Sequence, residues 1–597
     1  MKELKQKYKN LRPSQKRIVL ALTAITLYIL DAWLIGSITL IFKDWDLMLR
    51  CLRNPFVAAV LVPQKASIPL WIGLNFLVLL SLAAIAYGLW ARYPELQTRF
   101  MASKEPRIIN DPTHGTSNWM DRQEAEKHFS FGPGPGILLG RFEGEMIRHD
   151  NPRMNRNCIV FGPPLTGKTW SLVFPNVLQA VISEESAIIT DPKAEIMRET
   201  LKLAQNKGYA VRVFNLVDME SSDRWNPIEE VKTDLDAYLL SQVIIENTEG
   251  AQHRPMGDKF WERSEHNLLI ALILYIAYEA SPENRNLAGV YDLLTSGSFD
   301  ELDSIFKSLP DDHPAKRPYN LFCMTERKNQ GNIIQGLGTR LKVIQTDAVR
   351  RLTEKSDMDL ELPGRRKCMY YCIIPDSDST FQFLSSLFFS FLFLRLTRQG
   401  DRFGGGNPVR VNFIMDEFCT IGVLPDFTDR IATMRSRNIN CMMVTQSLPQ
   451  LKGRYPNESW KEIIGCCSLR LIWGSAEKET SQYISDLLGR TTVEELSFRR
   501  ERGEFDSATI TKAPRGRPLL DPSEVGRIPF DEGIALVLGA NPLRFKKMPY
   551  TEHPLAKELE SIKRYVPVKD RVLDDYDIII TGDHEETSKG WEGWIAN

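Results

Sequence analysis

Two long apolar stretches stand near the start of the chain, and mixed polar and apolar residues follow them. Residues 18–42 carry one charge, that of Asp31, and residues 68–91 carry none. At about 1.5 Å per residue, a helix over either stretch exceeds the ~30 Å hydrocarbon core of a bilayer. The first stretch is also too long for the apolar part of a cleaved signal peptide. The pattern therefore predicts a two-helix transmembrane anchor within residues 1–110.

Basic residues flank the two stretches on the sides away from the loop between them. They are Lys2, Lys5, Lys7, Lys9, Arg12, Lys16 and Arg17 before the first, and Arg92, Arg99, Lys104 and Arg107 after the second. Because cytoplasmic flanks are enriched in Lys and Arg, we expect a multi-pass protein of the cell membrane with both termini in the cytoplasm. A carboxyl group inside a span is costly, so we expect Asp31 to face the other helix or a neighbouring subunit.

From residue 111 the pattern changes to apolar runs that alternate with helical stretches. Short β-rich runs lie at 158–161, 186–195, 368–375, 409–418, 439–447 and 469–476. This alternation predicts a doubly wound α/β sheet. Residues 230–345 show helical periodicity and little strand signal, which predicts an all-α insertion between sheet segments 111–229 and 346–555.

The run "CIVFGPPLTGKTW", which begins at Cys158, has the spacing of a phosphate-binding loop. The pattern G-x-x-x-x-G-K-T is met by Gly162, Pro163, Pro164, Leu165, Thr166, Gly167, Lys168 and Thr169. Backbone N–H groups at a helix start bind phosphates, the lysine adds a charge, and the threonine hydroxyl can hold Mg²⁺. The loop therefore predicts ATP and Mg²⁺ as ligands, although an eight-residue pattern also occurs by chance. Pro163 and Pro164 remove two of the N–H donors.

Two further strands end in polar side chains that suit the same chemistry. The run "VRVNFIMDEF" ends in Asp416 and Glu417, and the run 439–447 contains Gln446. Ligands of parallel sheets bind beyond the carboxyl ends of the strands. We expect Asp416 to bind the metal with Thr169, Glu417 to polarise the attacking water, and Gln446 to sense the γ-phosphate. The alternatives are a helix N-cap for the acidic pair and a strand-end cap for Gln446.

Composition limits how the chain could bind nucleic acid. It has 75 Lys and Arg residues against 76 Asp and Glu, so any such contact must be local. Basic runs at 499–502, 515–517 and 544–547 could follow a DNA strand or be solvated surface. The tail 556–597 is acidic towards its end, which suits docking to a basic partner or a solvated terminus. The nine cysteines have no zinc-site spacing and are expected to be reduced thiols.

The ordered set of motifs resembles the coupling-protein ATPases of conjugation and type IV secretion, the TraG/TraD-like family. The matching runs include "HGTSNWM" at 114–120, "TDPKAE" at 190–195, "DKFWERSEHNLL" at 258–269 and "MDEFCTIGVLPDF" at 415–427. The resemblance extends from the first apolar stretch to about residue 550. It departs from the family pattern in the two prolines of the loop and in Ala194, where glycine is usual.

The resemblance implies a RecA-like P-loop domain that hydrolyses ATP in a hexameric ring on the inner face of the membrane. It implies that Arg435 is an arginine finger that reaches a neighbour's nucleotide. The implied partners are single-stranded DNA, the relaxase bound to it, and the proteins of the secretion channel. Two alternatives stay open: an FtsK/HerA-like DNA translocase of another process, and a membrane receptor that binds substrates without hydrolysing nucleotide.

Overall fold

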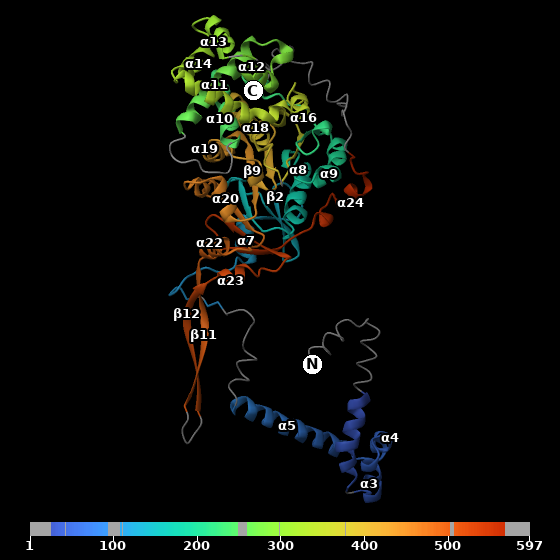
Figure 1. The fold of residues 1–597 in the computed structure, drawn as a ribbon. Coiled ribbons are helices and arrows are strands. Elements are labelled where there is room, and N and C mark those ends of the chain that lie inside the picture. The colour runs from blue at the N-terminus through green and yellow to red at the C-terminus, as the bar shows by residue number, and fades with distance from the viewer. Residues whose placement is uncertain are drawn as a thin grey trace, which may run out of the picture. The chain divides into compact units, whose positions relative to one another are not determined.

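The computed structural model describes residues 25–41, 43–92, 108–109, 111–248, 259–295, 297, 299–376, 378–501 and 507–566. The chain divides into two compact units. One comprises residues 1–107 and 494–513, and the other comprises residues 108–493 and 514–597. Figure 1 shows the helices and strands of each unit.

The N-terminal unit is helical. Its named helices are α3 (Trp45–Arg53), α4 (Pro55–Lys65) and α5 (Ile68–Arg92). Within α5, the segment Ile68–Tyr87 is long and apolar enough to cross a membrane, as judged by its length and composition. Among the described residues it is the one helix that meets this criterion.

The first predicted span is not confirmed. Residues 18–24 and Phe42 lie outside the described part, and the apolar helical segment that is described is Ile25–Leu40. At about 1.5 Å per residue, these residues reach about 24 Å, short of the ~30 Å of a hydrocarbon core. The segment is also irregular, because a π-turn (Ala32–Gly36) and a 3₁₀ turn (Ser37–Leu40) follow Asp31. The described residues thus contain one candidate span, and the second span predicted from the sequence stays a prediction.

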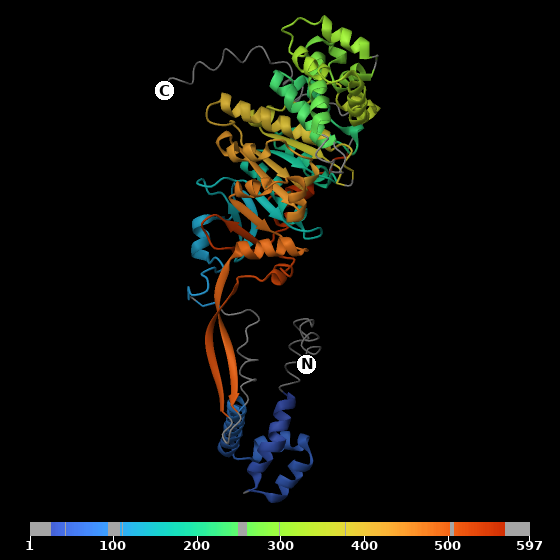
Figure 2. The ribbon, with the colours of Figure 1, turned by 60° about the vertical axis from the view of Figure 1, so that its left-hand side comes forward.

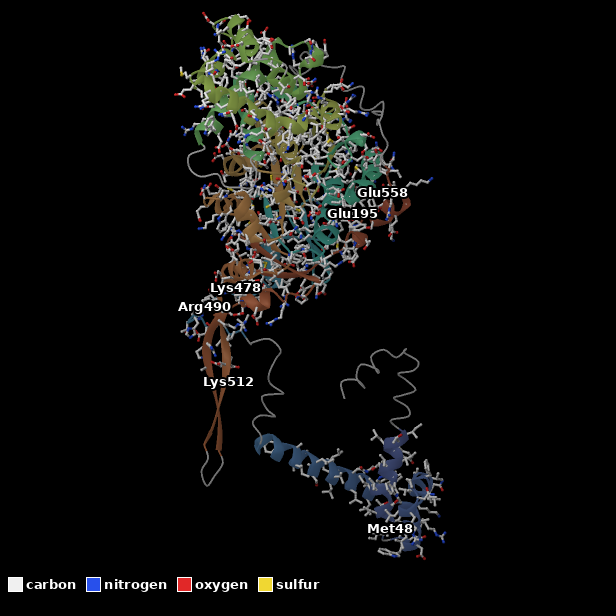
Figure 3. The ribbon with its side chains drawn as sticks, viewed as in Figure 1. Met48, Glu195, Lys478, Arg490, Lys512 and Glu558 are labelled. Carbon is white, nitrogen blue, oxygen red and sulfur yellow. The ribbon has the colours of Figure 1, made fainter. Side chains whose placement is uncertain are left out.

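A two-stranded hairpin is formed by β11 (Arg490–Glu501) and β12 (Ser507–Pro518). Lys512 Nζ and Glu494 Oε1 form an ion pair of 3.2 Å across it. Figure 3 labels Lys512 and Arg490 on these strands. The side chains of 499–501 and residue Arg502 lie outside the described part, so the structure does not test the basic run there.

The larger unit is built on a twelve-stranded sheet of order β1-β3-β2-β14-β13-β10-β4-β9-β8-β5-β7-β6. Its parallel strands are β4 (Cys158–Phe161), β5 (Ser186–Thr190), β6 (Ala210–Asn215), β7 (Cys368–Ile373), β8 (Val411–Met415), β9 (Ile439–Thr445) and β10 (Leu469–Ile472). Antiparallel strands extend it: β1 (Ser130–Phe131), β2 (Ile137–Phe142), β3 (Glu145–His149), β13 (Glu532–Val537) and β14 (Leu543–Lys546). This mixed α/β sheet agrees with the predicted fold class.

Helices cover both faces of this sheet, as Figure 2 shows. Along β4, Ile159 and Phe161 join one buried cluster, whereas Cys158 and Val160 join the other. This alternation is what a strand buried on both faces requires. One cluster includes α8 (Phe174–Ser183) and α9 (Glu195–Asn206), and the other includes α18 (Gln382–Arg402). The predicted strand at 158–161 is therefore a central, fully buried strand.

Only helices occur in the described residues between β6 and β7. The longer ones are α10 (Asp234–Thr248), α11 (Lys259–Glu279), α12 (Leu287–Thr295), α13 (Phe299–Ser308), α14 (Lys316–Cys323), α15 (Arg327–Leu341) and α16 (Asp347–Leu352). They belong to the same compact unit as the sheet. Ion pairs tie this region to α18, since Arg398 Nη1 lies 2.7 Å from Asp236 Oδ1 and Arg395 Nε lies 2.7 Å from Glu230 Oε2. The domain boundaries at 229/230 and 345/346 stay predictions.

Shorter helices follow β8. They are α19 (Phe427–Thr433), α20 (Leu448–Arg454), α21 (Ser459–Gly465), α22 (Lys478–Leu488), α23 (Pro522–Val525) and α24 (Ala556–Ser561). Helix α24 packs near α9, where Lys207 Nζ and Glu558 Oε1 lie 2.8 Å apart. Figure 3 labels Glu558 on α24 and Glu195, the first residue of α9. Residues 567–597, most of the predicted acidic tail, lie outside the described part.

Candidate active site

The loop 162–168 connects β4 to the helical segment that starts at Thr169. Gly162 is required by close packing, because a Cβ there would lie 2.9 Å from Trp473 Cβ and 3.0 Å from Lys168 Cδ. Gly167 and Leu165 have positive φ angles of 78° and 66°. For leucine this conformation costs roughly 1–2 kcal/mol, and the side chain is 95% exposed. Strain of this kind persists mainly where function requires the backbone shape.

The helix after the loop begins with a π-turn, Thr169–Val173, before α8. Its closing bond runs from the N–H of Phe174 to the carbonyl of Thr169. Pro175 follows at the start of α8, and proline has no N–H with which to continue an ordinary helical ladder. Such wide turns are often found at functional sites. Free N–H groups at this helix start would face an anion bound in the loop.

Lys168 is buried against the loop. Its ammonium donates to the carbonyl oxygens of Gly162 at 2.6 Å and Pro163 at 3.1 Å. Burial lowers its pKa, and the nearby charge of Glu417 opposes that shift. Glu417 Oε1 lies 3.8 Å from Lys168 Nζ. The loop lysine and the acidic pair, 248 and more residues apart along the chain, therefore share one site.

Asp416 follows β8 and meets the residue after the loop lysine. The Thr169 hydroxyl donates to Asp416 Oδ2 at 2.5 Å. Asp416 is buried, and its Oδ1 atom has no hydrogen-bond partner among the described residues. Burial raises its pKa to about 6. A threonine hydroxyl beside a carboxylate with an unpartnered oxygen is an oxygen donor set that fits Mg²⁺, which usually keeps further ligands from water and phosphates.

Glu417 lies between Lys168 and Gln446. The side-chain amide of Gln446 donates to Glu417 Oε2 at 2.9 Å. Glu417 has a left-handed backbone, with φ of 57°. Gln450 fixes the strand end nearby, because its Oε1 accepts from the N–H of Gln446 at 3.1 Å. Strands β8 and β9 thus bring both predicted polar ends to the loop.

A second carboxylate, Asp191, lies beyond the end of β5. It caps the start of α9 by accepting from the N–H groups of Glu195 at 3.1 Å and Met197 at 2.8 Å. Burial raises its pKa to about 6, and the charge of Asp416 adds to the shift. The neighbouring Thr190 hydroxyl donates to the carbonyl of Asp416 at 2.6 Å. The run "TDPKAE" therefore holds the backbone of Asp416 in place at the end of β8, through the Thr190 hydroxyl.

Lys547 is a residue of this site that the sequence pattern does not reveal. Its ammonium donates to the carbonyls of Thr166 at 3.2 Å and Trp473 at 2.9 Å. Burial lowers its pKa to about 8. Lys547 thereby links the phosphate-type loop to the end of β10. The sole sequence signal is its place in a basic run, which suggests a DNA contact rather than a loop contact.

The other basic residues of that run are also engaged within the protein. Arg544 Nε lies 2.6 Å from Glu532 Oε2, and Lys546 Nζ lies 2.7 Å from Asp531 Oδ2. Arg517, of the run 515–517, pairs with Glu524. Partly exposed ion pairs of this kind are weak, so the DNA contact predicted for these runs stays a prediction.

Arg435 is not brought to this site within the chain. It lies in the 3₁₀ turn Met434–Arg437, just before β9, and its side chain donates to the carbonyl of Pro152 at 2.9 Å. Gln446 follows the other end of β9, the end that lies beside the loop. The seven residues of Ile439–Thr445 span about 23 Å at ~3.3 Å per residue. Arg435 is exposed near the start of β9, the end away from the loop, so it does not reach Lys168 or Glu417 of its own chain.

In the described residues, no group of three or more His, Cys, Asp or Glu side chains could hold a metal ion, and all nine cysteines are free. The mixed sheet, the loop after β4 and the carboxylates at the ends of neighbouring strands define an α/β protein of the P-loop class.

Comparison with known proteins gives the family. Residues 91–570 match the family described as Type IV secretory system Conjugative DNA transfer, and the chain belongs to this family of coupling proteins. The protein VirD4 of Rhizobium radiobacter is 24% identical over 516 residues, which cover 83% of this chain and 70% of that protein. The conjugal transfer protein TraG of Escherichia coli is 24% identical over 474 residues, covering 70% of this chain and 72% of TraG.

Solved structures give the same fold. The plasmid coupling protein TrwB in complex with a non-hydrolysable ATP analogue, ADPNP, matches with a TM-score of 0.56 at 13% identity. The match covers 75% of this chain and 96% of that one. TrwB in complex with ADP and Mg²⁺ matches with a TM-score of 0.55 at 12% identity. At these identities, the likeness establishes the fold.

Proposed function

We propose that this protein is a membrane-anchored ATPase that recruits a DNA–relaxase or protein substrate and delivers it to a type IV secretion channel. One observation carries the enzymatic part of the proposal. The Thr169 hydroxyl lies 2.5 Å from Asp416 Oδ2, and Glu417 lies between Lys168 and Gln446. A loop that only binds phosphate would not need Asp416, Glu417 and Gln446 beside it.

Each side chain has a role in phosphoryl transfer to water. Glu417 orients the attacking water and accepts its proton, while the bond between the γ-phosphorus and the oxygen of the ADP leaving group breaks. Lys168 moves from the loop carbonyls to the phosphate oxygens, where its charge is stabilising. Gln446 holds Glu417 and senses the γ-phosphate. The helix start at Thr169 receives the remaining phosphate oxygens.

Thr169 and Asp416 would hold Mg²⁺, which supplies positive charge that neutralises the phosphate oxygens. Asp191 stays outside this pair because its two oxygens are used by the start of α9. Of the structural neighbours, TrwB is in complex with ADPNP in one structure and with ADP and Mg²⁺ in another, which supports these ligands for the present chain.

The assembly we propose is a homo-hexameric ring in which Arg435 of one subunit reaches the nucleotide of the next. The position of Arg435 before β9 supports this, because it is exposed at the edge of the sheet opposite the loop. The membrane anchor would include α5 and the stretch 18–42, with both termini in the cytoplasm. The partners we propose are single-stranded DNA, the relaxase bound to it and the proteins of the secretion channel; the family's description supports DNA and a type IV secretory system.

The experiment is ATP turnover by the full-length protein, with and without single-stranded DNA, combined with substrate transfer in cells. Wild type should hydrolyse ATP and support transfer. Glu417→Gln should bind ATP but lose turnover, and Lys168→Ala should lose binding. If both variants support transfer at wild-type levels, the ATPase proposal is wrong and a receptor that recruits substrates without hydrolysis is favoured. If the wild-type protein hydrolyses ATP and moves DNA in another process but does not support substrate transfer, an FtsK/HerA-like role is favoured.

A further inference from the structure

The order of strands gives the bound nucleotide a direction. The catalytic carboxylates follow β8, the loop follows β4, and β9 lies between them. Neighbouring strands are about 4.8 Å apart, so the γ-phosphate end of the nucleotide lies towards β8, about two strand spacings from β4. The base end must then extend the other way, over β10 and β13, which lie on the far side of β4.

Phe530 lies on that far side. It lies two residues before β13, and its ring approaches the loop: a Cβ placed on Gly167 would be 3.4 Å from Phe530 Cζ. The ammonium of Lys547 lies 5.5 Å from the centre of the same ring. Although its ring lies near the loop and Lys547, Phe530 is 62% exposed.

Hydrogen bonds hold the groups beside this ring in place. Lys547 is held by the carbonyls of Thr166 and Trp473, as described above, and its N–H donates to the carbonyl of Asp531 at 2.8 Å. Trp473 is buried and donates to the Ser171 hydroxyl at 3.0 Å. The ring therefore lies beside a hydrogen-bonded part of the loop and has an open surface, which suits a stacking platform for a flat base.

We infer that Phe530 is the platform on which the purine base of the nucleotide stacks. The inference rests on the proposed function, since it assigns the base-binding part of the same site. Stacking uses the ring faces that adenine and guanine share, so Phe530 supports both without selecting between them.

The test separates base binding from phosphate binding. Equilibrium binding of ATP, GTP and inorganic tripolyphosphate is measured with Mg²⁺ on the full-length protein. Phe530→Ala should weaken ATP and GTP by about five- to fiftyfold and change tripolyphosphate less than about twofold. Phe530→Leu should lose most of the same affinity, and Phe530→Trp should retain it. Phe403→Ala is the matched control, because Phe403 is 53% exposed at the end of α18, and it should change nothing.

Two results would overturn the inference. One is ATP affinity unchanged in Phe530→Ala. The other is equal weakening of ATP and tripolyphosphate, which would mean that the ring only supports the loop. Failure of the proposed function has a different signature, since Lys168→Ala and Glu417→Gln would then support transfer at wild-type levels, whatever Phe530→Ala does to ATP affinity.

Discussion

At the scale of single residues, several non-glycine residues have a left-handed backbone conformation, which is strained. Leu165 and Glu417 carry it at the site, where the shape of the loop and the aim of the carboxylate give it a purpose. Glu143 carries it in an ordinary turn. That turn has two central residues, Glu143 and Gly144, because Phe142 of β2 pairs with Glu145 of β3. With φ angles of 50° and 88°, the turn is one that favours Asn-Gly.

Glu143→Asn should therefore stabilise the protein. Asparagine tolerates a positive φ better than glutamate, so the free energy of unfolding should rise by about 0.5–1 kcal/mol. Glu143 is exposed, so the exchange disturbs no buried contact. The measurement is thermal or denaturant unfolding. The control Glu560→Asn, at an exposed position in α24, should be neutral or slightly destabilising, and an equal gain there would contradict the turn argument.

His553 should make the larger unit sensitive to acid. Burial lowers its pKa to about 4. Its Nδ1 accepts from the N–H of Leu555 at 3.2 Å, and its Nε2 faces Gln179 Oε1 at 3.3 Å, so the neutral ring is the form that fits. The stabilisation is complete above the unfolded pKa near 6.5 and is lost as pH falls through about 4.

Between pH 6.5 and 4, unfolding of the wild type takes up one more proton than unfolding of His553→Gln. As the pH falls, the free energy of unfolding of the wild type should therefore decrease more steeply, by up to about 1.4 kcal/mol per pH unit. Unfolding midpoints measured across this range test it. Parallel curves for the two proteins would show that the ring is not buried in its neutral form.

At the scale of elements, Asp236 joins the inserted helices to the sheet unit. It is fully buried, and its Oδ2 accepts from the N–H groups of Lys232 at 3.0 Å and Thr233 at 2.9 Å at the start of α10. Its Oδ1 accepts from Arg398 Nη1 of α18 at 2.7 Å. One carboxylate thus serves as helix cap and as interhelical ion pair.

Asp236→Ala should lower the free energy of unfolding by about 2–4 kcal/mol, because it leaves two backbone N–H groups and one arginine without their acceptor. Asp236→Asn should lose less, since its amide oxygen can still accept. The control is Asp234→Ala, two residues earlier and exposed, which should change stability by less than about 0.5 kcal/mol. Equal effects of the two alanine variants in an unfolding experiment would contradict this assignment.

The sequence predicts elements well where their signal is local. The strand–loop–helix at 158–169, the acidic end of β8 and the polar end of β9 each lie within one short run, and the structure brings these runs together. Lys547 could not be predicted in the same way, because its partner Thr166 is 381 residues away. The span predicted for the first apolar stretch rests on length and hydropathy alone. Those properties do not reveal the irregular turns after Asp31.

At the scale of the whole molecule, each nucleotide site of the proposed ring is built from the residues of two subunits. Arg435 lies about one strand length from the loop of its own chain, so its charge should serve another chain's nucleotide. Arg435→Ala should lower ATP turnover by at least about 10²-fold while leaving ATP affinity within about threefold.

Mixing subunits checks this shared site. Arg435→Ala and Lys168→Ala subunits are each inactive alone, but a mixed assembly pairs an intact loop with an intact Arg435. Turnover should reappear in the mixture. No recovery, with co-purification showing that the subunits do mix, would mean that Arg435 does not act across an interface.

The most direct test of the central claim is a double-mutant cycle on Mg²⁺-dependent ATP binding with Thr169→Ala and Asp416→Ala. The claim is that the loop after β4 and the acid after β8 act on one metal–nucleotide complex. Each single variant should abolish most of the gain in ATP affinity that Mg²⁺ gives wild type, and the double variant should lose no more than either single variant. Full Mg²⁺ enhancement in Asp416→Ala, or effects that simply multiply in the double variant, would contradict a shared site.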